Sequence, residues 1–201
     1  MKNELQHLAL NQGMQQKRKL WTAQGQVELE SLSLERWGAQ RRHDLLQLLA
    51  MFEAQMESLN SAVKKVAEAY PDARLLMTQP GVGLVAALAF ILTIGEVLRF
   101  RCSKQVRSYL GLIPRERSSG GKQRMGAISK QGNRLLRTLL VEAAQSVVRY
   151  DPEFRKEYVH RCHQKYRAVA KIAAARKLAA RLYWMLRIQK PNPDVFASRA
   201  A

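Results

Sequence analysis

The sequence predicts an all-α fold, in which a long N-terminal coiled-coil or helical hairpin precedes a compact helical domain. Residues 1–70 contain no proline, and apolar residues recur at helical spacing along most of the chain. No segment shows the sustained alternation of apolar and polar residues that is typical of a strand ladder. Pro71-Asp72 interrupts the first helical pattern. We therefore expect a coiled-coil or helical linker region over 1–70, a second domain over 71–190 and a disordered tail over 191–201.

The most regular helical pattern lies in residues 45–70. Its apolar residues are spaced alternately by four and three positions: Leu45, Leu49, Phe52, Met56, Leu59, Val63, Val66 and Tyr70. A heptad seam of this kind favours pairing between helices, so we expect copies of the chain to form a homo-oligomer through residues 45–70. The residues before the seam are less regular and predict one or two amphipathic helices.

After Pro71 the pattern predicts shorter helices. We expect them over 72–78, 84–92, 103–110, 133–149 and 167–188, with another that begins at Asp151-Pro152, and a loop over 113–132. The helix over 133–149 has a broad apolar face that includes Leu135 and Leu136. Ser129 or Asn133 is suited to cap the start of that helix.

A glycine turn separates the first two of these helices. Pro80-Gly-Val-Gly83 follows an apolar helix end and precedes a helix of small residues, which is the pattern of a helix-hairpin-helix. Glycine tolerates positive φ, so backbone N–H groups at such a turn can approach a phosphate closely. We expect Gly81, Val82 and Gly83 to contact DNA without reading its bases. The alternative is an ordinary helix turn that needs no ligand.

The charge of the chain indicates a polyanionic partner. With 34 Lys and Arg against 16 Asp and Glu, the formal net charge is +18. DNA is the partner we expect, although an anionic membrane surface or ribosomal RNA would fit the same charge. No apolar run is long enough to span a membrane, the N-terminus lacks a signal-peptide core, and two cysteines are too few for a disulfide framework. We therefore expect a cytoplasmic protein with no membrane partner.

Segment 111–133 is rich in glycine and strongly cationic. Between Arg101 and Arg137 there are ten basic residues and one acidic residue, Glu116. Guanidinium and ammonium groups pair with phosphates, so we expect DNA contacts from the basic residues of this segment and of the helix after it. They are Arg115, Arg117, Lys122, Arg124, Lys130, Arg134 and Arg137. Ser118 and Ser119 lie among these cations, where a hydroxyl could either bind a phosphodiester or attack it.

Two other groups of residues suggest chemistry of their own. Tyr109 is an alternative nucleophile, although packing against the Gly111 turn explains it more simply. His160, Cys162 and His163 are adjacent in sequence and lack a second cluster, whereas a zinc site needs four ligands. We therefore expect no metal ligands in this chain.

Five motifs in unbroken order resemble the C-terminal transposase domain of the Piv/MooV-type insertion-sequence transposases. They are Pro80-Gly-Val-Gly83, Ile94-Gly-Glu-Val-Leu-Arg-Phe100, Tyr109-Leu-Gly-Leu-Ile-Pro114, Ser119-Gly-Gly-Lys122 and Ile128-Ser-Lys-Gln-Gly-Asn-Arg134. With the closing segment from Ala168 to Leu178, the resemblance covers residues 72–188. Members of that family carry a RuvC-like DEDD domain at the N-terminus and a serine-bearing domain at the C-terminus.

The resemblance implies an enzyme that binds, cuts and joins DNA in the transposition of an insertion sequence. It implies Ser119 as the nucleophile, with the neighbouring Ser118 as the alternative. It also implies a guide RNA, and magnesium held by the carboxylates of the RuvC-like domain.

Residues 1–70 show no pattern suited to a RuvC-like domain. We therefore expect no cofactor in this chain and interpret it as a C-terminal fragment, a truncated copy or one half of a split gene. The alternative function is a non-catalytic, dimerising DNA-binding module that acts as a regulator.

Overall fold

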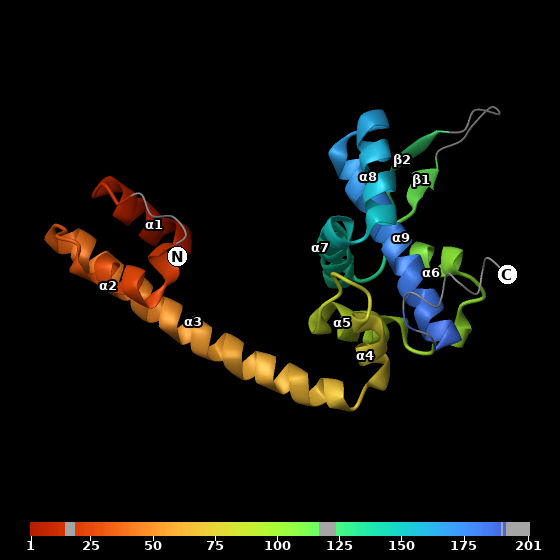
Figure 1. Cartoon of the computed structure of the whole chain (residues 1–201), viewed down its shortest axis with the longest axis horizontal. Helices are drawn as coiled ribbons and strands as arrows, with labels where there is room; N and C mark the ends of the chain where they lie inside the picture. The colour runs from red at the N-terminus through yellow and green to blue at the C-terminus, as the bar shows by residue number, and fades with distance from the viewer. Residues whose placement is uncertain (15–18, 117–123, 190, 192–201) are drawn as a thin grey trace. The chain divides into compact units, whose positions relative to one another are not determined.

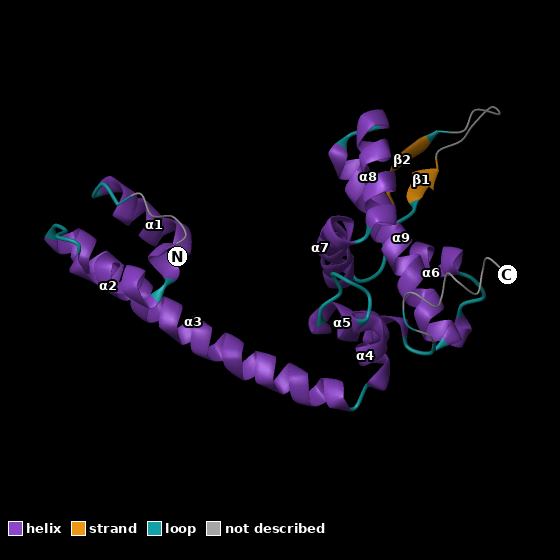
Figure 2. Cartoon of the chain, in the orientation of Figure 1, coloured by secondary structure: helices purple, strands orange, loops and turns teal. Residues whose placement is uncertain are grey.

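The computed structural model describes residues 1–14, 19–116, 124–189 and 191. Within these residues the chain is helical apart from one small two-stranded sheet (Figure 2), so the prediction of an all-α fold is confirmed. The chain divides into two compact units, Met1–Ala62 and Val63–Ala201. The boundary between the units falls inside one long helix, α3 (Arg36–Glu68).

The first unit contains α1 (Lys2–Asn11), the 3-10 turn η1 (Lys19–Trp21), α2 (Ala23–Ser31) and the first part of α3. Its core consists of the buried residues Leu5, Ala9, Leu20, Leu29, Leu45 and Leu49. The start of the predicted heptad seam is therefore used for packing within the unit. Further along α3, Phe52, Met56 and Leu59 are 50%, 58% and 62% exposed. Only this middle part of the seam leaves a continuous apolar stripe open.

The second unit begins at the last turn of α3 and is built around α9. Its elements are α4 (Pro71–Met77), α5 (Leu84–Ile94), η2 (Val97–Arg99), α6 (Ser103–Tyr109), β1 (Pro114–Glu116), β2 (Met125–Ile128), α7 (Arg134–Tyr150), α8 (Pro152–Gln164) and α9 (Arg167–Ile188). Helix α9 packs against α4, α6, α7 and α8 (Figure 1). Small buried residues on α9, among them Ala174, Ala175 and Ala179, let these neighbours approach it closely.

The predicted helices of the second unit are found, with bounds that differ by at most two residues. Leu135 differs from the prediction, because it is 63% exposed while Leu136 is fully buried. Segment 113–132 also differs, since it was expected to be a loop. Its described ends form the antiparallel strands β1 and β2, with Pro114 opposite Ile128, Glu116 opposite Met125 and an irregular register between the two pairs.

The base of this β-hairpin is closed by two glycines. Gly111 and Gly132 have φ angles of +66° and +76°, which favour glycine. A Cβ added to Gly111 would lie 2.1 Å from the carbonyl oxygen of Gln131, and one added to Gly132 would lie 2.2 Å from that of Tyr109. The two backbone segments therefore cross in direct contact. This contact, rather than apolar alternation, explains why strands form here.

A buried arginine connects three parts of the second unit. Arg181 of α9 is 4% exposed, and its guanidinium donates hydrogen bonds to Asp151, to Gln79 at 3.3 Å and to Glu153 at 3.2 Å. The guanidinium carbon lies 4.4 Å from the centroid of the Phe154 ring. Burial raises the pKa of the Asp151 carboxyl, but the hydrogen bond from Arg181 and two backbone N–H groups outweigh it, so this pKa is below its ordinary value. We call these five residues the Arg181 cluster.

Replacing Arg181 by methionine is expected to destabilise the second unit strongly. The change leaves the Asp151 carboxylate and the Gln79 amide without their partner, and breaking a buried ion pair costs about 3–5 kcal/mol. The free energy of unfolding, measured by chemical denaturation, tests this expectation. The matched control is Arg155→Met on α8, whose guanidinium bonds the carbonyls of Val148 and Arg149 at the surface. Equal losses in both variants would contradict the role of the cluster.

Replacing Gly132 by alanine is expected to disrupt the base of the hairpin. The added methyl group meets a backbone carbonyl, which cannot rotate away, and the positive φ adds strain of about 1–3 kcal/mol. Gly83→Ala is the control, because Gly83 has a φ of −87° and open space around its Cβ position. Thermal unfolding should show a lower Tm for Gly132→Ala only. If the two variants melt alike, the crossing is not a structural constraint.

Candidate nucleic-acid interface

The residues predicted to bind DNA divide into two groups. Ser118, Ser119, Arg117 and Lys122 lie outside the described residues. The remaining candidates lie in the second unit, around the hairpin and at the turn between α4 and α5: Gly81, Val82, Gly83, Arg115, Arg124, Lys130, Arg134 and Arg137.

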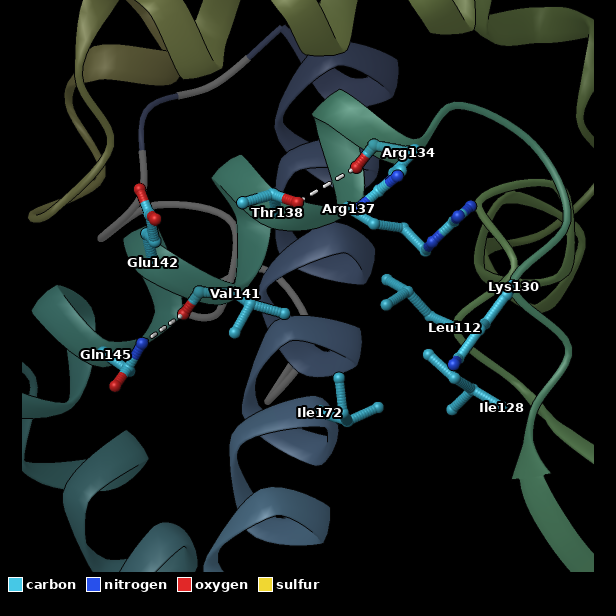
Figure 3. A pocket seen from close by; sticks show the side chains of 10 residues that line it. All are labelled: Leu112, Ile128, Lys130, Arg134, Arg137, Thr138, Val141, Glu142, Gln145 and Ile172. Atoms are coloured by element: carbon cyan, nitrogen blue, oxygen red, sulfur yellow. Dashed lines mark hydrogen bonds between the residues drawn. The ribbon is translucent and has the colours of Figure 1, made fainter.

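A pocket of about 610 Å³ lies beside the base of the hairpin. We call it the hairpin pocket; β2, the first turns of α7 and the start of α9 contribute its lining residues. Figure 3 shows the cations Lys130, Arg134 and Arg137 around one end of it, next to Leu112 and Ile128. A basic rim over an apolar wall can take a phosphate together with the apolar face of a sugar or base.

Lys130 occupies this rim with an unusual backbone. Its φ is +57°, in the left-handed region that side chains other than glycine rarely adopt. Its N–H donates to the carbonyl of Gly111 at 3.1 Å, which holds the residue in this conformation. An exposed lysine kept at such a position, where glycine would fit without strain, is consistent with a use for its side chain.

The two arginines of the rim are in different states. Arg137 donates hydrogen bonds to three backbone carbonyls, those of Leu110, Gln131 and Gly132, and thereby fixes the base of the hairpin. Arg134 is exposed, and its guanidinium has no hydrogen bond or ion pair with any described residue. Arg115, on β1, bonds the carbonyl of Ser129 at 2.9 Å. Arg134 and Lys130 are therefore the cations of the pocket that are available to a ligand.

The turn at Pro80 is explained largely by packing. Val82 is 5% exposed, and its N–H donates to the carbonyl of Gln79. Gly81 has a φ of +84°, and a Cβ there would lie 2.7 Å from the backbone nitrogen of Val147 in α7. Gly83 is the exposed member of the predicted set, directly before the first turn of α5. The proposed contact of this turn with DNA stays a prediction.

The other candidates have structural surroundings. The ring of Tyr109 lies 5.5 Å from that of Phe100, and the guanidinium of Arg99 lies 4.8 Å from the Tyr109 ring. Asn133 caps α7, since its Oδ1 accepts the N–H of Leu136 at 3.1 Å. Ser129 is not that cap; its Oγ is buried and has no partner among the described residues.

The described residues contain no group of three or more His, Cys, Asp or Glu side chains that could hold a metal ion. The acids nearest to the centre of the second unit, Asp151 and Glu153, are already paired with Arg181. The residues described here therefore do not fit the magnesium that the resemblance implies. None of the helices in the described part of the chain is long and apolar enough to cross a membrane.

Sequence reasoning did not single out the Arg181 cluster. Arg181 lies in a helix with many basic residues, and its partners Gln79 and Asp151 are 102 and 30 residues away in sequence. One signal was present: Asp151-Pro152 marks the start of α8, where Asp151 Oδ1 accepts the N–H groups of Glu153 and Phe154. The second oxygen of that capping carboxylate receives Arg181.

Comparison with known proteins places this geometry among transposases. Residues 73–159 match the family described as "Transposase IS116/IS110/IS902 family". The chain is 40% identical over 88 residues to "Transposase for insertion sequence element IS1111A" of Coxiella burnetii, covering 44% of this chain and 24% of the relative. It is 34% identical over 151 residues to "Probable family 20 transposase" of Pseudomonas aeruginosa, covering 70% and 44%.

A third relative is the "Pilin gene-inverting protein" of Moraxella lacunata, which is 35% identical over 124 residues, covering 59% of this chain and 38% of the relative. The chain thus spans less than half the length of each of these three relatives. The matched residues 73–159 run from α4 to α8 and include both strands of the hairpin. The second unit of this chain therefore contains a domain of the Transposase IS116/IS110/IS902 family, and its homologues are named transposases of insertion sequences.

Proposed function

We propose that the second unit binds DNA at the hairpin pocket and supplies Ser119 as the nucleophile for strand cleavage and joining during transposition. The observation that carries the proposal is the pairing of two available cations, Lys130 and Arg134, at the base of the hairpin. The segment joining β1 to β2 contains Ser119 in the sequence, inside the matched family domain. DNA held at the pocket would therefore be close in sequence terms to the proposed nucleophile.

The chemistry requires a hydroxyl and a positive field. The Ser119 Oγ would form a bond to phosphorus and lose its proton, while the oxygen of the departing strand takes the electron pair of the broken P–O bond. Cations near the phosphate stabilise the charge that develops in the transition state. The phosphoserine link conserves the energy of the broken bond for rejoining. The carboxylates of a RuvC-like domain, with their metal ions, would come from outside the described residues.

The proposal includes self-association. Phe52, Met56 and Leu59 form an exposed apolar stripe on α3 at heptad spacing, and a second copy of the chain could cover it. This stripe is shorter than the seam expected from the sequence, because Leu45 and Leu49 are buried in the first unit and Val63 and Tyr70 pack in the second. A guide RNA remains an implication of the resemblance, and the cytoplasm is the compartment we propose.

Replacing Ser119 by alanine is expected to abolish a covalent protein–DNA adduct while leaving DNA binding intact. The assay uses the full chain, a RuvC-like domain supplied in trans, and a DNA substrate whose scissile position carries a phosphorothiolate, which traps the adduct. Ser118→Ala is the matched control and should still form the adduct. If the wild-type chain forms none, or Ser119→Ala forms it equally well, the nucleophile is wrong and a non-catalytic DNA-binding module is the better description.

Replacing Lys130 by glycine is expected to weaken DNA binding without lowering stability. Glycine accepts the positive φ, so Tm should be retained, while one phosphate contact is lost. The slope of log K against log salt for a duplex should become less steep by about 0.9. Arg74→Gln, an exposed residue of α4 outside the pocket, should leave the slope unchanged. Equal slopes for wild type and Lys130→Gly would remove Lys130 from the interface.

A further inference from the structure

A second group of cations lies on the other packing surfaces of α9. Arg107 belongs to α6, Arg161 to α8 and Arg176 to α9. Both α6 and α8 pack against α9, and Figure 1 shows the three helices together in the second unit. We call these three residues the arginine cluster. They do not line the hairpin pocket.

Arg176 is the central member of the cluster. Its side chain is partly buried, and its Nε is fully buried with no hydrogen-bond partner among the described residues. Burial lowers the pKa of the Arg176 guanidinium, and the charges of Arg107 and Arg161 lower it further. The three guanidinium groups are therefore close enough to repel one another.

Carboxylates do not offset this repulsion. On α8 and α9 the ion pairs join Lys177 to Glu153 and Glu157, and Arg181 to Asp151 and Glu153. In the described part of the chain, no carboxylate lies within 4.0 Å of a cation of the arginine cluster. The folded protein thus keeps a partly buried guanidinium beside like charges, an arrangement that costs free energy unless an anion occupies it.

We propose that Arg107, Arg161 and Arg176 form a binding site for one backbone phosphate of DNA. Guanidinium groups match the geometry of phosphate oxygens through paired hydrogen bonds, and the unpartnered Nε of Arg176 supplies a donor. The choice of DNA rests on the function proposed above. The site lies outside the hairpin pocket, so it would hold the nucleic acid at a second point and fix its direction across the second unit.

The test replaces Arg176 by methionine, which keeps the apolar stem and removes the charge. Without ligand, at low salt, Arg176→Met should melt at the same temperature as wild type or higher, because the repulsion is relieved. Inorganic pyrophosphate should raise the Tm of the wild-type chain and not that of Arg176→Met. On duplex DNA the salt slope should become less steep by about 0.9, whereas Arg74→Gln should bind like wild type.

The outcomes separate this site from the proposed function. If wild type binds duplex DNA and Arg176→Met shows the same slope, the site is refuted while DNA binding stands. A lower Tm for Arg176→Met with an unchanged pyrophosphate response would make Arg176 a structural residue. If the variant loses affinity for single-stranded RNA but not for duplex DNA, the assignment to DNA is overturned. If wild type does not bind DNA, the proposed function fails, and a pyrophosphate response that depends on Arg176 leaves an anion site of another kind.

Discussion

The second unit depends on one buried ion-pair cluster. Arg181 is paired with the carboxylate that caps α8, and the same guanidinium holds Gln79 at the start of the turn between α4 and α5. Three segments that are distant in sequence are thus fixed by one side chain. A buried guanidinium without these partners would be strongly unfavourable, so the cluster forms completely or the segments separate. The orientation of the Pro80 turn follows from packing inside the protein, and any contact with DNA has to use the surface that this packing leaves open.

Arginine has a second structural use in this chain, at the ends of helices. Arg99 bonds the carbonyl of Ile94 at the end of α5, and Arg155 bonds those of Val148 and Arg149 in the last turn of α7. Arg42 does the same for Leu29 and Leu32 at the end of α2. The carbonyls at a helix C-terminus have no partner within the helix and carry partial negative charge, so cations stabilise them. A part of the net charge of +18 is therefore used for folding and cannot be counted as phosphate contacts.

The sequence predicts the helices well because their signals are local. The apolar spacing of α7 and its cap at Asn133 lie within a few residues of each other, and the predicted bounds differ by one residue. The hairpin was missed because its strands depend on contacts between residues such as Gly111 and Gln131, 20 positions apart in the chain. Arg137 was predicted to bind DNA for its charge alone. The bonds to three carbonyls that occupy it appear only when the loop closes on α7.

The same distinction separates candidate ligand-binding cations from structural ones. Arg137, Arg181 and Arg187 each donate to carbonyl or carboxylate oxygens of the protein. Lys130 is held in a strained conformation, and Arg176 keeps a buried donor without a partner. Folding alone would favour glycine at the first position and an apolar residue at the second, since both changes relieve a cost in the free protein. Cations retained against the stability of the free chain are best explained by an anion that compensates them, and the two positions give a bound nucleic acid two separate points of attachment.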